Sequence, residues 1–489
     1  MRIEKSSGTT PTEKLLADLC EATFLKLWSY PNPYKSDGKE LCDLIAVFEN
    51  HVFVFFDRES LKLQNKENDI LLAWERWKRT AIDKQIDTAL GAERYLLGKN
   101  KIFLDAKQRV PFPISIPEKD IYIHKIIVAH GASEACRNFS ADNISGSLAI
   151  CYGENIPDFK TPFLVPMNKK SCVHLFDSEN IEIILRELDT FFDFKAYIVA
   201  KEKAIQELMF LNYCGEEDLL AHYFQNFDDA NNCHYIGTSD KTINGVWVAE
   251  GEWKDFSQSK VYSRKNEANK VSYFWDDLIQ KTAGNALDGT LLGDTRVFHG
   301  QSAIIEMAKE PRFSRRTLSE CMLKSGGDFP DNLGKIARNV SFFQSYYPDT
   351  GYVFLQIKHD DIKDYDNDYR PKRQTMLQIA CGAAKIKFTH LKKIVGIAIE
   401  APKFSETVSE DFVLLLCDKW SSADTQYYRD QNKVLGFFEK TSLKIYEAKS
   451  REFPDTVSSI INRKIGRNEP CPCGSGKKFN GFYPLGHEL

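Results

Sequence analysis

The sequence predicts a multidomain α/β protein. Apolar runs of strand length alternate along the chain with longer segments that have helical periodicity. A length of 489 residues is too great for one hydrophobic core, at roughly 150 residues per domain. The composition is that of a globular chain, with 43% hydrophobic and 27% charged residues, and it excludes a disordered, collagen-like or low-complexity protein.

The first hundred residues predict a helix, two strands and a second helix. The segment Thr10-Pro11-Thr12-Glu13 opens the first helix with proline at its first position, and apolar residues follow at helical spacing as far as Leu27. Residues 41–48 and 51–56 are apolar on successive positions, which predicts two strands in a sheet covered on both faces. Residues 69–97 predict a long amphipathic helix.

The remaining chain predicts two further α/β regions and a tail. The proline-rich stretch at 110–117 indicates a domain boundary, and beyond about residue 454 the chain becomes polar and glycine-rich. Strands are expected at 121–129, 147–152, 171–176, 352–357, 394–400 and 412–417, and helical segments at 180–227 and 372–387. The expected domains are 1–110, 118–270 of unknown role, 271–453 as a possible sensor or partner-binding domain, and 461–489 as the tail.

Several classes of protein are excluded or disfavoured. No apolar run approaches the 18 or so residues of a membrane span, and the N-terminus has no apolar core of a signal peptide, so no membrane association is expected. The 12 cysteines are too dilute for a disulfide scaffold, which predicts a reduced, cytoplasmic setting. A net charge of −4 does not mark a nucleic-acid binder, although a local basic groove would suffice.

Three acids stand in an informative order in the N-terminal region. Glu13 lies on the first helix, Asp43 in the first strand, and Asp57 fourteen residues later after the second strand. Asp43 is flanked by apolar residues, where an ionised carboxylate is costly unless it is paired or bound to a metal. Glu13 shares a helical face with apolar residues, so its carboxylate is expected to face the core.

This order of acids resembles the PD-(D/E)XK, or restriction-endonuclease-like, nucleases. The resemblance implies a nuclease fold for residues 1–110, with Glu13, Asp43 and Asp57 holding Mg²⁺ or Mn²⁺, and a nucleic-acid substrate, DNA more than RNA. It also implies a metal-activated water that attacks the phosphodiester, and a role in prokaryotic defence against phage. The family's lysine would stand two residues after Asp57, where this chain has Glu59, so Lys84 and Gln85 on the following helix are the candidates to replace it.

Ordinary structural roles compete with this interpretation. Thr10 and Glu13 form a capping box, Thr-x-x-Glu, which by itself explains the glutamate. Asp57 and Glu59 fit solvated residues at the end of a strand. Arg58 is a poor substitute for the lysine, because a fixed cation cannot act as a base.

The tail carries the most specific pattern in the chain. The segment Ile465-Gly-Arg-Asn-Glu-Pro-Cys-Pro-Cys-Gly-Ser-Gly-Lys-Lys-Phe479 resembles the SEC-C motif, a small zinc knuckle known from the C-terminus of the translocation ATPase SecA. Cys471 and Cys473 match its first ligand pair, but Phe482 and Tyr483 stand where the second pair belongs. With His487 the tail offers three ligands at most, while a closed zinc site needs four, so a degenerate motif that holds little Zn²⁺ is expected.

Two further interpretations stay open. Arg312, Arg315 and Arg316 could bind phosphate at a helix start, with a solvated charged face as the ordinary alternative. The whole chain could be a non-catalytic SEC-C adaptor that docks on a translocation, chaperone or ribosome-associated partner through its tail. The absent motif lysine favours the adaptor, and the apolar surroundings of Asp43 favour the metal-dependent endonuclease. The oligomeric state is not predicted.

Overall fold

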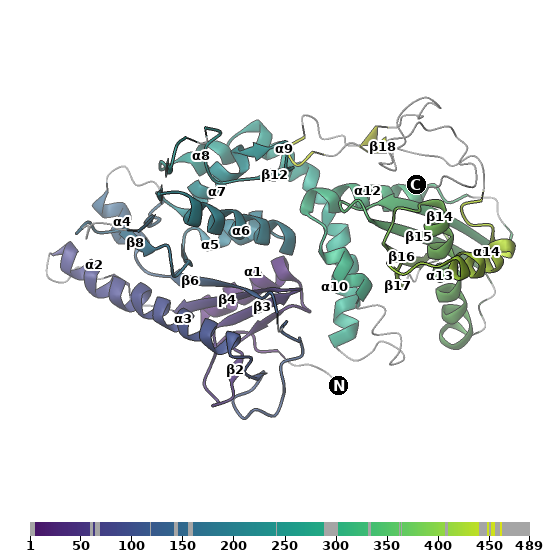
Figure 1. Cartoon of the computed structure of the whole chain (residues 1–489), viewed down its shortest axis with the longest axis horizontal. Coiled ribbons are helices and arrows are strands. Elements are labelled where there is room, and N and C mark those ends of the chain that lie inside the picture. Colours follow the sequence, from purple (N-terminus) through teal and green to yellow (C-terminus); the bar gives the residue numbers. More distant parts are fainter. Residues whose placement is uncertain are drawn as a thin grey trace. The chain divides into compact units, whose positions relative to one another are not determined.

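The computed structural model of the chain describes residues 5–454 and 460–461, apart from residues 59–61, 64–68, 118, 141–144, 155–159, 241, 288–301, 331–333, 361, 363, 406–408, 440–446 and 449–450. It is a mixed α/β structure that divides into two compact units, an N-terminal unit that ends at Ser259 and a C-terminal unit that begins at Lys260. Figure 1 shows the elements of both units.

The N-terminal unit contains a five-stranded and a four-stranded sheet. Its helices are α1 (Pro11–Phe24), α2 (Ile70–Lys78), α3 (Lys84–Leu97), α4 (Ser133–Phe139), α5 (Ile181–Glu187), α6 (Phe191–Glu207), α7 (Glu216–Gln225) and α8 (Glu252–Ser257). Its strands are β1 (Ser29–Pro31), β2 (Tyr34–Lys35), β3 (Leu44–Phe48), β4 (His51–Arg58), β5 (Ile102–Phe103), β6 (Tyr122–Ala129), β7 (Ala149–Gly153), β8 (Leu164–Asn168), β9 (Val173–Asp177), β10 (Phe210–Tyr213), β11 (Phe227–Asp228), β12 (Cys233–His234) and β13 (Gly245–Val248).

The five-stranded sheet has the order β1-β3-β4-β6-β9. Strand β3 is antiparallel to both β1 and β4, whereas β4, β6 and β9 are parallel. Every residue of β3 is buried, as expected from its unbroken apolar run. The carboxyl ends of β4, β6 and β9 therefore meet at one edge of the sheet, where ligand sites of parallel sheets form.

Helices cover both faces of this sheet (Figure 1). Consecutive residues of β6 show the two faces, because side chains alternate along a strand. His124 bonds to Glu202 of α6, at 2.8 Å from Nδ1 to Oε1, and Lys125 pairs with Glu93 of α3. Helices α1 and α6 thus lie on one face, and α3 lies on the other.

The α1 face is held by aromatic packing. Phe24 of α1 packs against Phe53 and Phe55 of β4, with ring centroids 5.4 and 6.2 Å away, and edge-to-face against Phe194 of α6 at 5.3 Å. Helix α1 begins with the predicted capping box, in which the Thr10 hydroxyl accepts from the Glu13 N–H and Glu13 returns a bond. On the other face, α2 and α3 run on through a π-helical turn, Arg79–Asp83, so the predicted helix at 69–97 is present.

The four-stranded sheet has the order β13-β10-β7-β8. Strand β10 lies inside the segment predicted to be helical throughout, between α6 and α7, and pairs with both β7 and β13. Lys201 of α6 and Glu216 of α7 are fully buried and join the two helices by an ion pair, with Nζ 2.6 Å from Oε2. The four residues of β10 are extended rather than helical because their backbone groups pair with two neighbouring strands, β7 and β13.

The C-terminal unit is built around one four-stranded sheet, β14-β15-β16-β17. Strands β15 and β16 are parallel and joined through α13, and the outer strands are antiparallel to them. The elements are α9 (Lys260–Asn269), α10 (Tyr273–Leu287), α12 (Arg312–Gly327), β14 (Ile336–Gln344), β15 (Thr350–His359), α13 (Arg370–Lys387), β16 (Lys393–Glu400), β17 (Glu410–Leu416), α14 (Ser422–Leu435), β18 (Glu447–Ala448) and β19 (Ile460–Ile461).

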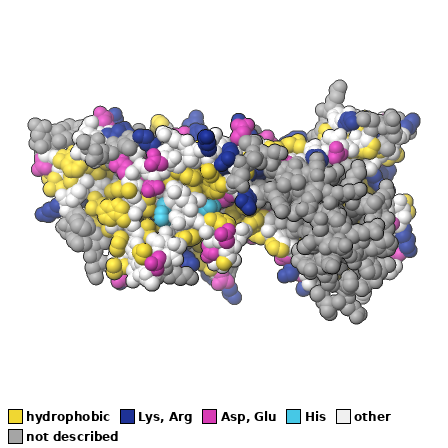
Figure 2. Space-filling view, turned by 90° about the horizontal axis from the view of Figure 1, so that it is seen from above, with side chains coloured by type: hydrophobic (Ala, Val, Ile, Leu, Met, Phe, Trp, Pro, Cys, Tyr) yellow, Lys and Arg dark blue, Asp and Glu magenta, His cyan; other side chains and the backbone are white. Residues whose placement is uncertain are grey.

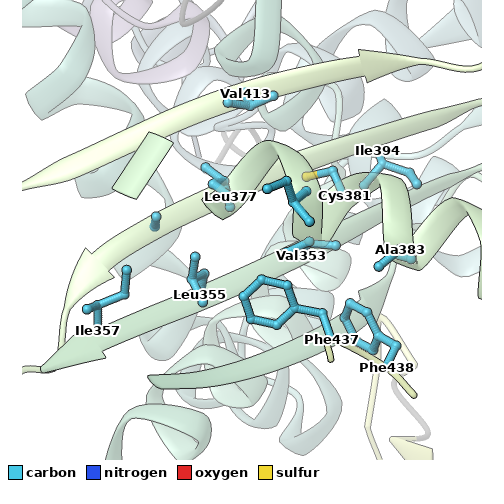
Figure 3. Close-up of a cluster of buried hydrophobic side chains, with 14 of the residues drawn as sticks. Val353, Leu355, Ile357, Leu377, Cys381, Ala383, Ile394, Val413, Phe437 and Phe438 are labelled. Carbon is cyan, nitrogen blue, oxygen red and sulfur yellow. The ribbon is translucent and has the colours of Figure 1, made fainter. Parts of the chain in front are cut away.

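A core cluster lies between α13 and this sheet (Figure 3). Leu377 and Cys381 of α13 face Val353 of β15 and Ile394 of β16, all of them fully buried. Burial of such side chains contributes about 1.5–3 kcal/mol each, so this interface stabilises the unit.

The predicted domain boundaries fall differently on the structure. The stretch at 110–117 lies inside the N-terminal unit, because β6 beyond it pairs with β4 before it. The break between units, at Ser259 and Lys260, is close to the boundary expected at residue 270. A proline-rich stretch at the surface resembles a linker in sequence, although here it connects β5 and β6 within one unit.

Candidate functional site

Asp43 and Asp57 lie side by side at the end of two neighbouring strands. Asp43 directly precedes β3, and Asp57 is the penultimate residue of the antiparallel β4. The Asp57 N–H donates to Asp43 Oδ2 at 2.6 Å, and the Asp43 N–H donates to the carbonyl of Phe55 at 3.0 Å. The carboxylate of Asp43 is therefore fixed against the backbone that carries Asp57.

Asn32 links two more acids to this place. Its Nδ2 donates to Glu40 Oε1 at 2.6 Å and contacts Glu13 Oε2 at 3.4 Å, and its backbone N–H donates to the carbonyl of Asp43 at 2.9 Å. Asn32 has a positive φ of 48°, a backbone conformation that asparagine tolerates better than most residues. One buried amide thus gathers Glu13, Glu40 and the Asp43 loop.

The charges around Asp43 are other acids. Burial raises the pKa of Asp43 to about 7, and the negative charges of Glu40, Glu13 and Asp57 add to the rise against the hydrogen bond from Asp57. Burial also raises the pKa of Glu40. Burial opposes ionisation of Glu13, but hydrogen bonds from Thr9, Asn32 and the helix start outweigh it and lower the pKa of Glu13. A cation placed here would relieve this repulsion.

Asp57 is buried with one oxygen engaged and one free of partners. Its side chain is only 1% exposed; Oδ1 contacts His130 Nε2, and Oδ2 has no hydrogen-bond partner among the described residues. An unpartnered buried carboxylate oxygen is costly, and a bound cation is one way to satisfy it. His130 directly follows β6, so the parallel pairing of β4 and β6 brings it beside Asp57.

The two helix residues predicted to replace the motif lysine are not brought to these acids. Lys84 is exposed, and Gln85 is buried with its Nε2 donating to the carbonyls of Ala81 and Val128. Asp57 shares the face of Phe53 and Phe55, which pack on α1, whereas α3 covers the opposite face. Gln85 therefore reaches the sheet from the side away from the acids.

The capacity of the site for metal rests on Asp43 and Asp57. Mg²⁺ binds through one or two carboxylates with water and substrate oxygens completing its six ligands. Glu13 keeps its capping role, and in the part of the chain that the structure describes the three predicted acids do not bring ligand atoms within 4.8 Å of one another as a set. Glu13 thus lies near the site as a neighbouring charge. Glu59 falls outside the described residues.

The predicted phosphate-binding arginines serve the interior of the C-terminal unit. Arg312 and Arg315 both pair with Asp276, with nitrogen–oxygen distances of 2.6 and 2.5 Å. Arg316 is buried and donates to Asn269 Oδ1 at 2.7 Å. Both the phosphate-binding interpretation and the solvated-face alternative are corrected by this burial, because the guanidinium groups are engaged with acceptors of their own unit.

Three residues of the site were not predicted from the sequence. Asn32 lies between two prolines and reads as part of a turn, and Glu40 reads as an ordinary charge before a strand. His130 offered one usable signal, because it follows a strongly apolar strand, and the ends of parallel strands converge. No helix among the described residues is long and apolar enough to cross a membrane.

Comparison with known proteins identifies one motif. The SEC-C motif model matches residues 467–479. The translocase subunit SecA of Caldicellulosiruptor saccharolyticus is 44% identical over 41 residues, 8% of this chain and 5% of that protein, and SecA of Geotalea uraniireducens is 58% identical over 26 residues, 5% and 3% respectively. No solved structure matches the chain. Cys471, Cys473 and His487 lie outside the described residues, and the chain carries a SEC-C motif in its tail.

Proposed function

We propose that the N-terminal unit is a Mg²⁺- or Mn²⁺-dependent nuclease with Asp43 and Asp57 as the metal ligands. The observation that carries the proposal is the buried, unpartnered Oδ2 of Asp57 beside the Asp43 carboxylate, in surroundings where the neighbouring charges are acids. Two carboxylates on adjacent strands are also the arrangement that the resemblance to PD-(D/E)XK nucleases implies.

The residues of the site would divide the work as follows. Asp43 and Asp57 bind the ion, His130 positions the Asp57 carboxylate through Oδ1, and Asn32 keeps Glu13 and Glu40 nearby. When bound, a divalent ion lowers the pKa of a coordinated water and neutralises charge on a phosphodiester. No described contact joins Lys84 to the acids, so a lysine that orients the water is not part of this proposal.

A polyanionic substrate fits the site only together with such an ion, because four acids alone repel phosphate. Among the side chains that Figure 2 colours by type, basic ones are interspersed with acidic and hydrophobic ones and form no continuous band. We therefore propose that the bound ion and local contacts supply most of the affinity for the substrate. A preference for DNA over RNA and a role in phage defence are what the resemblance implies.

The test compares cleavage of double-stranded DNA, single-stranded DNA and RNA by the full chain with Mg²⁺ or Mn²⁺. Asp43→Asn and Asp57→Asn should each abolish cleavage, on the order of 10³-fold or more, because each removes a ligand charge. Asp229→Asn, an exposed acid of the same unit, is the matched control and should keep full activity. Cleavage that survives both ligand variants contradicts the proposal.

Metal binding gives a readout that does not depend on finding the substrate. Mg²⁺ should raise the melting temperature of the parent chain and of Asp229→Asn, since an ion that binds only the folded state stabilises it. It should not raise that of Asp43→Asn. A parent chain that Mg²⁺ and Mn²⁺ leave unchanged in melting temperature would speak against a metal site here.

The SEC-C motif supports a second candidate, a non-catalytic adaptor. The match at residues 467–479 is shared with the SecA translocase subunits, so the tail would dock on a translocation, chaperone or ribosome-associated partner. The adaptor is favoured if the parent chain neither binds Mg²⁺ nor cleaves any substrate, while deletion of residues 462–489 abolishes co-purification of one defined partner.

A further inference from the structure

A second cluster of ligating side chains lies between β9 and α6, on the same face of the sheet as Asp57. Cys172 directly precedes β9, His174 is the second residue of β9, and Glu202 lies on α6. Cysteine, histidine and glutamate each offer one ligand atom, and these atoms all lie within 4.8 Å of one another. Cys172 has a positive φ of 45°, so it stands just outside the extended strand, and the distances between the ligand atoms place its thiol beside His174 and Glu202.

The hydrogen bonds of this cluster leave ligand atoms unused. Glu202 Oε1 accepts from His124 Nδ1 at 2.8 Å and lies 3.2 Å from His174 Nε2. Both contacts use the same oxygen. His174 is fully buried, and its Nδ1 has no hydrogen-bond partner among the described residues. A buried ring nitrogen without a partner is costly in a purely structural network.

We propose that Cys172, His174 and Glu202 form a binding site for Zn²⁺ that is separate from the Asp43–Asp57 site. A thiolate, an imidazole and a carboxylate are the donor types that zinc takes, and the mixed set disfavours Mg²⁺ and Ca²⁺. Bond lengths of about 2.0–2.3 Å in a tetrahedral site place ligand atoms roughly 3.5 Å apart. Since the ligand atoms lie within 4.8 Å of one another, each pair needs to approach by about 1.3 Å at most to bind the ion.

The surroundings suit an ion held by three protein ligands. His51 Nδ1 lies 2.8 Å from His124 Nε2, and His124 in turn bonds to the Glu202 carboxylate. These two histidines fix the orientation of the carboxylate, as hydrogen-bonded neighbours of metal ligands commonly do. Hydrogen bonds from His124 and His174 hold the pKa of Glu202 well below its ordinary range, although burial opposes this. Burial raises the pKa of the Cys172 thiol to about 12, so zinc must displace its proton.

Access and neighbouring charge are compatible with binding. Cys172 and Glu202 are half-buried, so an ion can reach them from solvent, and the fourth position is left to water or an added ligand. The positive charges of Lys125 and Lys201 lie near the thiol, but each is paired with its own acid, Glu93 and Glu216.

The test measures zinc in a full-length chain whose tail cannot contribute, carrying Cys471→Ser and Cys473→Ser. We expect this chain to retain about one Zn²⁺ after dialysis, and to show a thiolate-to-metal absorption band when loaded with Co²⁺. Adding Cys172→Ser should remove both the retained zinc and the band. Adding His124→Gln instead should weaken zinc binding by about 10–100-fold, as loss of a group behind a metal ligand does.

Cys233→Ser is the matched control, since that cysteine is exposed and lies in the same unit. It should leave zinc content and the Co²⁺ band unchanged. The proposal is overturned if the tail variant, folded by circular dichroism, binds neither Zn²⁺ nor Co²⁺ through sulfur, or if Cys172→Ser keeps both. If Cys172→Ser does not fold, the proposal is tested by the tail variant alone. It then requires a Co²⁺ band in that variant and weaker metal binding when His124→Gln is added.

Discussion

Asp43 illustrates how a single carboxylate can oppose folding. Its pKa of about 7 lies above the ordinary value of about 3.9 because burial and three neighbouring acids disfavour its charge. Between these two values the folded chain holds a proton that the unfolded chain has lost. The free energy of unfolding therefore falls as the pH rises from about 4 to about 7, and this loss is complete above pH 7.

Asp43→Asn should reverse this loss. The amide cannot ionise, and its oxygen can still accept from the Asp57 N–H. At pH 8 with chelator present, the variant should gain on the order of 3 kcal/mol in free energy of unfolding, and at pH 4 it should gain nothing. Urea unfolding at both pH values measures this, with Asp229→Asn as the control. A loss of stability at pH 8 would mean that Asp43 has a stabilising partner.

At the residue scale the sequence singled out Asp43 and Asp57, which the structure places side by side, but it did not single out their neighbours. A charge inside an apolar run stands out, because its burial has to be compensated. Asn32 and His130 do not stand out, since their roles arise from a left-handed turn and from the parallel pairing of distant strands. Lys84 and Gln85 lie away from these acids for a related reason: the helix can be predicted from the sequence, but the face of the sheet that it covers cannot.

Secondary structure elements were predictable where the apolar pattern is long and uniform. Strands β3, β4, β6 and β16 and the continuous helix of α2 and α3 all follow such patterns. Strand β10 did not, because its four residues lie between two helices and are extended only through pairing with β7 and β13. Short strands depend on tertiary partners more than on their own residues.

The junction between α6 and α7 depends on one buried ion pair. Glu216 accepts from Lys201 and also from the hydroxyls of Tyr197 and Tyr213, at 2.6 and 2.9 Å. Lys201→Met should cost about 3–5 kcal/mol in free energy of unfolding, because it leaves a buried carboxylate without its counter-charge. Lys203→Met, at an exposed position of the same helix, should cost less than about 0.5 kcal/mol. If Lys201→Met and Lys203→Met lower the free energy of unfolding in denaturant by the same amount, the buried ion pair does not stabilise this junction.

The whole molecule consists of two units, each with its own core. The N-terminal unit packs aromatic side chains of α1, α6 and β4, and the C-terminal unit packs α13 on its own sheet. The boundary could not be read from composition, because no proline-rich or glycine-rich stretch marks it. The proline-rich stretch that does occur joins β5 and β6 inside the N-terminal unit.

A fragment of residues 5–259 should therefore fold alone. We expect a single cooperative transition in thermal unfolding and a rise in melting temperature with Mg²⁺ equal to that of the full chain, because the acids and their partners all lie within this unit. A fragment that is folded but insensitive to Mg²⁺, next to a full chain that responds, would place part of the metal site outside it.

The buried thiols of Cys20 and Cys42 lie near Asp57 and Asp43, so they can report local opening of the strand ends that carry these acids. Burial, with the charges of Asp57 and Asp43 beside them, raises the pKa of Cys20 and Cys42 well above the ordinary value, so neither should react with a thiol reagent while the edge is closed. Their labelling rate then reports how often local unfolding exposes them, in the manner of hydrogen exchange. A divalent cation that ties Asp43 to Asp57 should slow labelling at both cysteines and leave Cys233, already exposed, as fast as before.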